Sequence, residues 1–210
     1  MIRALFVIAI ALAPRAARAD CARDADALRA HLTSQAHGVR MWNTLWAIGF
    51  GAAAAGQFAL AATETNPLGP FDRDFEESLY VGGVKATIGF ASRVVMPLRV
   101  DVPGPDADRC RELAQLRASL TTIAKKERQT FWLTHLGGLA LNLAGAAVLW
   151  ERRSFVVGAL SFATSFPIGP ISAYTMPRGS WHRWRSERAS WSIAVTPRAG
   201  GGSLGIAGTF

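Results

Sequence analysis

The stretch LRAHLT at residues 28–33 returns as LRASLT at residues 116–121, 88 residues further along the chain. The same offset aligns more identical residues: Ala36 with Ala124, Arg40 with Arg128, Leu45 with Leu133, Gly49 with Gly137 and Ala52 with Ala140. Ten of the 25 positions from 28 to 52 are therefore identical, where composition alone would give about two or three. Because a repeated unit usually folds as two similar modules packed on each other, the sequence predicts a tandem duplication.

In both copies an amphipathic helix leads directly into an apolar stretch about as long as a membrane span. In the first copy we expect a water-exposed helix over 20–39 and a membrane span over 41–62. In the second copy we expect the corresponding helix over 106–130 and the span over 131–150. The second of these spans has Trp132 near its start, where an amphipathic ring favours the membrane–water interface.

Each copy has room for a second span, at 75–98 in the first copy and at 154–176 in the second. The first of these carries Lys85 and Arg93, and each charge costs about 2.5–3.5 kcal/mol at the bilayer centre. Both lie towards the ends of the segment, so their long side chains can reach out to the membrane surface. The alternative is an amphipathic helix lying on that surface. We favour a span, because the repeat then has two spans per copy.

The second span of the second copy contains the sequence FPIGP at residues 166–170. Two prolines and a glycine in the second half of a helix must break or kink it, since proline lacks the N–H that a helix needs. We therefore expect a broken helix over 154–176.

These patterns predict an all-α membrane protein built from a tandem duplication of one amphipathic helix and two transmembrane helices. The first repeat covers 20–100 and the second covers 101–177, which gives four spans. The remaining residues, 178–210, form a basic tail rich in tryptophan, which we interpret as an interfacial anchor. Alternating apolar residues from Trp191 onward, interrupted by a turn at 197–202, predict a short C-terminal β-hairpin.

Residues 1–19 have the features of a cleaved export signal. A basic start is followed by an apolar stretch from Ala4 to Ala13, which is too short to span a membrane. Ala17 and Ala19 are small residues at the two positions that a signal peptidase reads. The alternative is an uncleaved membrane anchor.

The only two cysteines, Cys21 and Cys110, each precede one copy of the leucine-rich helix and are one residue out of register under the 88-residue offset. In an oxidising compartment, two cysteines at matching places in two copies predict a disulfide that joins the helix starts. The alternative is a pair of unrelated thiols.

A cleaved signal places the amphipathic helices and the C-terminal tail on the extracytoplasmic side of a bacterial-type inner membrane. Most lysines and arginines lie on that same side, between Arg99 and Arg128 and between Arg178 and Arg188. The positive-inside rule would reverse this orientation. We follow the signal peptide, because a short apolar stretch behind a basic start is typical of an export signal.

The formal net charge of the chain is +8. A basic balance can indicate nucleic-acid binding, but an exported membrane protein meets little nucleic acid. We therefore expect anionic lipid head groups as the counter-charge and no nucleic-acid partner.

The sequence contains no nucleophile elbow, phosphate-binding loop, dinucleotide fingerprint or zinc-ligand pair. Two of its four histidines, His31 and His37, are six residues apart and so lie on different faces of a helix, which argues against a shared metal. We expect no enzyme activity, no catalytic residues, no cofactor and no metal.

Four polar residues fall inside the predicted spans and are the candidate intramembrane site: Lys85, Arg93, His135 and Asn142. Lipid makes such groups costly without a partner or water, so they are functional candidates by default. The structural alternative is that the two cations reach the surface, His135 lies at the interface and Asn142 bonds a neighbouring helix.

Two function classes follow from these features. The first is a cell-envelope interaction or scaffold protein, whose C-terminal tail is captured by a partner or adds a strand to a partner's sheet. The alternative is a small transporter or channel, formed as a homo-oligomer, that uses Lys85, Arg93 and the proline-broken fourth span. A membrane enzyme ranks below both, because the chain shows no convergent acid, base or metal set.

Overall fold

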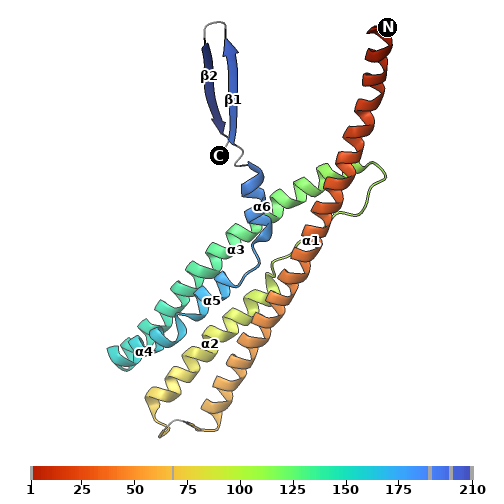
Figure 1. Cartoon of the computed structure of the whole chain (residues 1–210). Helices are drawn as coiled ribbons and strands as arrows, with labels where there is room; N and C mark the ends of the chain where they lie inside the picture. The colour runs from red at the N-terminus through yellow and green to blue at the C-terminus, as the bar shows by residue number, and fades with distance from the viewer. Residues whose placement is uncertain (1, 68, 189–190, 199–200, 209–210) are drawn as a thin grey trace. The chain divides into compact units, whose positions relative to one another are not determined.

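The computed structural model is predominantly helical (Figure 1). It describes the backbone of residues 2–67, 69–188, 191–198 and 201–208, and the side chains of residues 20–67 and 69–188. Two helices are long, α1 (Ile2–Ala62) and α3 (Arg109–Arg152). The shorter helices are α2 (Arg73–Val95), α4 (Phe155–Ser165), α5 (Ile168–Tyr174) and α6 (Gly179–Arg188).

Within the described residues, three helical segments are long and apolar enough to cross a membrane: Asp20–Ala62, Arg109–Arg152 and Phe155–Tyr174. They cover the predicted spans at 41–62 and 131–150 and most of the one at 154–176. This finding indicates a membrane protein. Helix α2, which covers most of the predicted span at 75–98, does not belong to this group of three.

Helices α1 and α3 each run without a break through a predicted amphipathic helix and a predicted span. Helix α3 begins at Arg109, three residues after the predicted start at 106, because the Asp108 carboxylate caps it. This carboxylate accepts hydrogen bonds from the backbone N–H groups of Cys110, at 3.0 Å, and Arg111, at 3.3 Å.

Helix α2 ends at Val95, three residues before the predicted end of the segment at 98. Met96 leaves the helical conformation, with φ −125° and ψ 55°. The reason is Pro97, whose ring disfavours helical backbone at the residue before it.

The predicted break in the fourth span is confirmed. Helix α4 starts after Ser154, whose hydroxyl accepts a hydrogen bond from the Val157 N–H, and it ends at Ser165. Helix α5 starts only at Ile168, so the helix is interrupted at 166–167, where the first proline of FPIGP lies.

Contacts divide the chain into two compact units, which we name the clamp unit and the bundle unit. The clamp unit comprises residues 1–33, 101–125 and 178–210. The bundle unit comprises residues 34–100 and 126–177. Helices α1 and α3 contribute residues to both units.

The core of the clamp unit consists of the leucine stripes of the two repeats. Leu28 and Leu32 from α1 and Leu116 and Leu120 from α3 are each at most 2% exposed. Burial of apolar side chains of this size contributes about 1.5–3 kcal/mol each. The buried residues of the two amphipathic helices therefore follow their leucine-rich stripes, within one compact unit.

Close backbone approach characterises the packing of the bundle unit. An added Cβ at Gly83 of α2 would lie 2.7 Å from the Phe58 ring of α1. An added Cβ at Gly158 of α4 would lie 2.6 Å from the backbone oxygen of Ala146 in α3. Small residues at such crossings let helices pack closely where lipid removes the hydrophobic driving force.

The tail contains one helix, α6, within the segment that the sequence analysis interprets as an interfacial anchor. A hydrogen-bonded ion pair one turn apart supports it, with Arg183 Nε 3.0 Å from Glu187 Oε1. Strands β1 (Trp191–Arg198) and β2 (Gly201–Gly208) follow and pair antiparallel, with Trp191 opposite Gly208 and Arg198 opposite Gly201.

Candidate functional site

The two units differ in the surface that they expose. Every large apolar side chain that is exposed in the described part of the chain belongs to the bundle unit. On α2 they include Tyr80, Val84 and Ile88, which follow one another at four-residue spacing and are 46–52% exposed. A soluble protein rarely exposes apolar patches this large, so this surface is suited to contact lipid.

Lys85 of α2 lies on the interior side of the bundle unit. Its Nζ donates hydrogen bonds to Ser165 Oγ at 2.8 Å, Asn142 Oδ1 at 3.3 Å and Ser161 Oγ at 3.4 Å. These acceptors come from α3 and α4, so one ammonium group ties three helices together. All three acceptors are neutral.

Arg93, two turns further along α2, is held in a similar way. Its guanidinium group donates a hydrogen bond to Ser172 Oγ at 2.9 Å and lies over the Trp42 ring, 4.1 Å from the ring centroid. The Trp42 ring is 5% exposed, and its Nε1–H donates to the Ser172 carbonyl at 3.1 Å. A cation over an indole face is an attractive contact that strengthens when water is excluded.

Neither Lys85 nor Arg93 pairs with an acidic side chain in the part of the chain that the structure describes. The idea that these cations reach outward to the membrane surface is therefore wrong for both. The physical reason is that three hydroxyl oxygens, one amide oxygen and one aromatic face lie within their reach on the interior side. The bundle unit thus holds two cations that no acidic group of its own neutralises.

The other two candidate residues lie in the same unit. Asn142 is 7% exposed; its side-chain N–H groups donate to the Gly138 carbonyl at 2.9 Å and the Ser165 carbonyl at 3.5 Å. His135 stacks on Phe131, with ring centroids 6.1 Å apart, and meets Tyr174 edge-on. The structure brings Asn142 together with Lys85 and does not bring His135 to either cation.

The end of the bundle unit where α2 begins and α3 ends carries a different pattern of charge. Arg153 lies 3.1 Å from Glu77 Oε1 and 3.5 Å from Asp74 Oδ1. Arg152 lies 3.4 Å from the other oxygen of Glu77. Arg152 and Arg153 are therefore paired with the acidic residues at the start of α2.

In the clamp unit, Cys21 and Cys110 form the predicted disulfide, with 5.0 Å between their Cα atoms. That separation lies in the normal range for a disulfide. The bond joins α1 and α3 close to the leucine stripes, and it closes a sequence separation of 89 residues.

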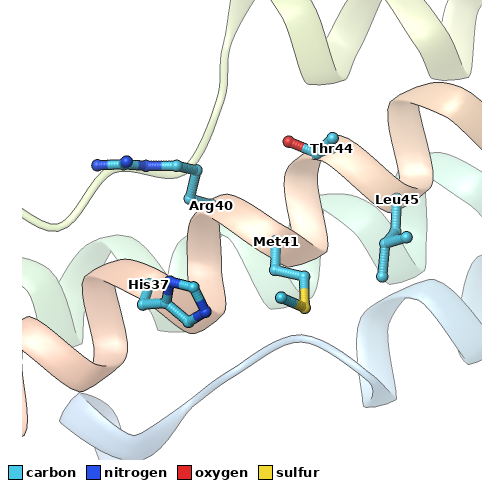
Figure 2. A pocket seen from close by; sticks show the side chains of 5 residues that line it. All are labelled: His37, Arg40, Met41, Thr44 and Leu45. Carbon is cyan, nitrogen blue, oxygen red and sulfur yellow. The ribbon is translucent and has the colours of Figure 1, made fainter.

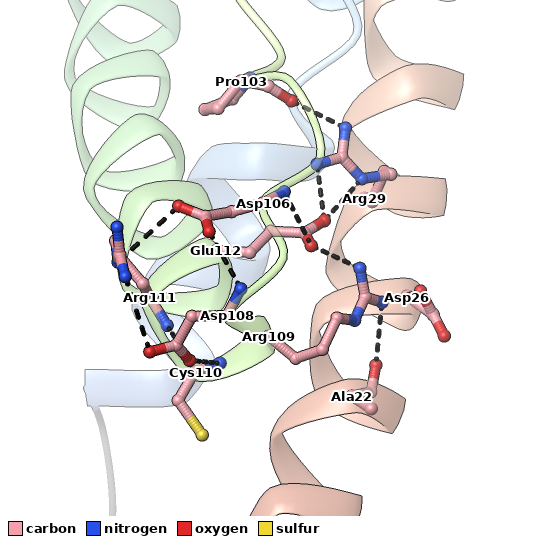
Figure 3. Close-up of polar contacts among 10 residues, drawn as sticks. All are labelled: Ala22, Asp26, Arg29, Pro103, Asp106, Asp108, Arg109, Cys110, Arg111 and Glu112. Atoms are coloured by element: carbon pink, nitrogen blue, oxygen red, sulfur yellow. Dashed lines mark hydrogen bonds and ion pairs between the residues drawn. The ribbon is translucent and has the colours of Figure 1, made fainter.

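An ion network lies beside the disulfide (Figure 3). The Glu112 side chain is fully buried, and Arg29 donates to its Oε1 from Nε at 2.8 Å and from Nη2 at 2.5 Å. A third N–H of Arg29 donates to the Pro103 carbonyl at 2.6 Å. Because it bonds both the acidic side chain and the loop before α3, Arg29 fixes this loop against α1.

Arg109 completes the network from the other side. It pairs with Glu112 Oε2 and with Asp26 of α1, and it also donates to the Ala22 carbonyl at 3.3 Å. The Arg29 hydrogen bonds hold the pKa of the Glu112 carboxyl below its usual value, against the opposing effect of burial. The Asp106 backbone N–H and the Arg109 charge act in the same direction.

His31 also belongs to the clamp unit. Burial lowers the pKa of its imidazole below the usual value, and the positive charge of Arg183 lowers it further, while Glu187 acts in the opposite direction. We therefore expect the neutral form of His31 to be the one that fits the fold.

A shallow hollow of about 260 Å³ lies on one face of α1 in the bundle unit (Figure 2). It is lined by five exposed residues: His37, Arg40, Met41, Thr44 and Leu45. Figure 2 shows His37, Met41 and Leu45 projecting to one side of α1 and Arg40 projecting to the other.

Sequence reasoning does not find the ion network or the serines around the cations. Glu112 does leave a signal, because it lies four residues before Leu116, on the side of α3 that carries the buried stripe. A carboxylate at that position predicts a buried partner. The hydroxyls of Ser161 and Ser165 give no such signal, because small polar residues are common in membrane helices.

The described residues contain no group of three or more histidine, cysteine, aspartate or glutamate side chains that could hold a metal ion. The chain matches no protein-family model, and it shows no significant similarity to a curated protein or to a solved structure. The candidate functions therefore depend on the contacts, charges and exposed surfaces of this chain alone.

Proposed function

We propose that the protein is a membrane-anchored scaffold of the cell envelope, with four spans built from two repeated helical hairpins. The separation of surfaces carries this proposal: the bundle unit presents exposed apolar side chains, and the described clamp unit presents none of that size. The bundle unit is suited to lipid and the clamp unit to water. The proposed role is binding, not catalysis.

Helix α2 supplies the remaining span in this arrangement. Its 23 residues give a length of about 34 Å, against about 30 Å for the hydrocarbon core of a bilayer. Its average hydropathy is low because Lys85 and Arg93 are included, yet both cations bond to interior partners. The side of α2 that carries Tyr80, Val84 and Ile88 is the exposed one. A helix with apolar groups outside and charges inside suits a lipid surround.

The clamp unit supplies a rigid surface for a partner. A disulfide, a buried leucine core and a buried carboxylate with two arginines hold α1 and α3 together. Rigid surfaces lose little conformational entropy on binding, which favours affinity. The disulfide also supports an extracytoplasmic location at a bacterial-type inner membrane, because such bonds persist in oxidising compartments. Export would then require residues 1–19 as the signal.

The tail offers a second mode of recognition. Strands β1 and β2 pair only with each other in the described part of the chain. Each therefore has one edge whose N–H and C=O groups are available to an added strand. A partner with an exposed sheet edge would fit this hairpin.

The test compares partner capture by the full chain and by a chain that lacks residues 190–210. Both carry the same affinity tag and are cross-linked in the membrane before purification. A control with Glu112→Gln and an intact tail separates recognition by the tail from recognition by the clamp. We expect the deletion to lose specific partners that the full chain retains. An unchanged partner set in both variants contradicts the scaffold proposal.

The two cations without acidic partners favour a second candidate function, a small homo-oligomeric transporter for anionic solutes. Lys85 and Arg93 would attract the anion, and the interruption between α4 and α5 would expose backbone groups to it. The test is anion flux in liposomes with the Lys85→Leu, Arg93→Leu variant. Equal flux in both proteins, or no flux in the native protein, contradicts this candidate.

A further inference from the structure

Contacts with helix α5 define one position, or level, along the length of the bundle unit. The Trp42 Nε1–H of α1 donates to the Ser172 carbonyl at 3.1 Å. The Phe131 ring of α3 lies 5.5 Å from the Tyr174 ring. The two long helices therefore reach α5 at residues 42 and 131, and these positions lie at a common level.

Each long helix carries an exposed arginine just before this level. Arg40 precedes Trp42 by two residues, and Arg128 precedes Phe131 by three. The two arginines also match under the 88-residue offset of the repeat. Exposed leucines follow each of them by five residues, Leu45 at 62% and Leu133 at 64%. A change from cation to apolar side chain within about two turns is typical of the membrane surface.

Arg99 brings a third guanidinium group to the same level. It follows Leu98, whose carbonyl accepts a hydrogen bond from the Asn43 side chain of α1 at 2.8 Å. Arg99 is exposed, as are Arg40 and Arg128. We name these three arginines the basic belt. None of them has an acidic partner in the part of the chain that the structure describes.

The opposite end of the bundle unit provides the contrast. There Arg152 and Arg153 lie within 3.5 Å of the carboxylates of Glu77 and Asp74. Arg152 and Arg153 are therefore neutralised within the chain, whereas the arginines of the basic belt are left to an external anion. At this position the side chains of the helices change from charged to apolar, as they do at a membrane surface. The anion available at a membrane surface is a lipid head group.

The hollow shown in Figure 2 gives this anion a place on α1. Along α1, His37 and Arg40 come first among the lining residues, and Met41 and Leu45 follow towards the apolar stretch. A phosphate can accept hydrogen bonds from the guanidinium group of Arg40. The acyl chains can then lie along Met41 and Leu45.

We propose that the basic belt binds the phosphate groups of anionic phospholipids, with one head group in the hollow beside Arg40. The three arginines of the belt lie at one end of the bundle unit. They therefore select lipid in one leaflet of the membrane. This inference concerns the lipid around the protein and does not depend on the scaffold or transporter role.

The test is native mass spectrometry of the full-length protein released from micelles that contain equal amounts of phosphatidylglycerol and phosphatidylcholine. The native protein should retain phosphatidylglycerol in preference. Each arginine-to-glutamine change in the belt should weaken this preference by about fivefold, because a basic residue near an anionic surface contributes that much. The preference should also fall as salt rises.

Two controls keep the result specific. Arg152→Gln removes a paired cation at the other end and should leave the preference unchanged. Arg40→Lys and Arg128→Lys keep the charge and should retain most of it, even if the triple glutamine variant does not fold. Equal lipid retention by the native protein and the Arg40→Gln, Arg128→Gln variant overturns the proposal. So does displacement of the lipid by inorganic phosphate at the concentration where phosphatidylglycerol itself competes.

Discussion

The clamp unit and the bundle unit bury charge in opposite ways. In the clamp unit, the buried carboxylate of Glu112 meets Arg29 and Arg109. In the bundle unit, Lys85 and Arg93 meet only hydroxyl, amide and aromatic groups. Removing Glu112 therefore leaves two opposite charges behind, whereas removing Lys85 or Arg93 leaves only neutral groups.

The difference also separates structural from functional roles. A paired network such as that of Glu112 fixes geometry, and its charges are already balanced. Cations with neutral partners keep an unbalanced charge, which remains available to an external anion. We therefore interpret the clamp unit as a rigid structural element. The bundle unit retains a positive electrostatic potential, which can attract an anionic ligand or lipid.

The largest expected effect is the loss of the disulfide. Replacing Cys21 and Cys110 with serine should destabilise the clamp unit by about 2–4 kcal/mol, because the unfolded chain is no longer cross-linked. Hydrogen exchange should then accelerate in residues 20–33 and 109–125 and stay unchanged in α2. Equal acceleration in both units would show that the division into two units is wrong.

A matched pair of substitutions tests the contrast in buried charge. Lys85→Met leaves only neutral groups behind, so we expect a stability that is unchanged or up to about 4 kcal/mol higher. Glu112→Met leaves Arg29 and Arg109 without their shared carboxylate and should lower the unfolding temperature. Circular dichroism in detergent micelles measures both. A destabilised Lys85→Met protein together with an unaffected Glu112→Met protein contradicts the comparison.

Gly158 should tolerate no added methyl group, because a Cβ there would lie 2.6 Å from a backbone oxygen. We expect Gly158→Ala to cost about 1–3 kcal/mol through overpacking. The matched control is Gly49→Ala in α1, where the added Cβ has no atom within 4 Å. The control should be neutral or gain up to about 1 kcal/mol from helix propensity. Similar losses for both variants would contradict close packing of α4 on α3.

The smallest effects concern pH and should appear in the clamp unit. The lowered pKa of Glu112 means that its contribution to stability is complete above the usual carboxyl value, about 4.3, and is lost as the pH falls through its lower folded value. The lowered pKa of His31 works in the same direction, with stability falling below about pH 6.5.

Thermal unfolding followed from pH 8 downward should therefore show two losses. Glu112→Gln should remove the lower one and His31→Asn the upper one. A clamp unit whose stability rises on acidification would contradict both assignments.

The sequence predicts the parts of this fold that repeat or alternate. The stripes of Leu28 and Leu116 follow helical spacing, and their burial confirms it. The disulfide is predictable because the two cysteines occupy nearly equivalent places in the two copies of the sequence. The helix break is predictable because Pro167 lacks the N–H that a helix needs. Each of these signals is local, or depends on one comparison within the chain.

The parts that sequence reasoning misses depend on neighbours from other helices. The direction of Lys85 is set by Ser161 and Ser165, which lie 76 and 80 residues away in the chain. One partner of Glu112 is likewise distant, since Arg29 is 83 residues away, while Arg109 is a local partner three residues away. The repeat does not help here, because Arg117, the equivalent of Arg29, is exposed and has no acidic partner in the described chain.

The proposed four-span arrangement requires α2 to cross the membrane. Thiol labelling of two loop positions tests this crossing most directly. Gly69→Cys and Gly104→Cys place single thiols before and after α2 at exposed sites, while the native cysteines stay in their disulfide. A reagent that cannot cross the membrane is added to intact cells, and then to permeabilised cells. We predict that Cys at 104 reacts from outside and Cys at 69 only after permeabilisation. Labelling of both positions from the same side would contradict a four-span protein.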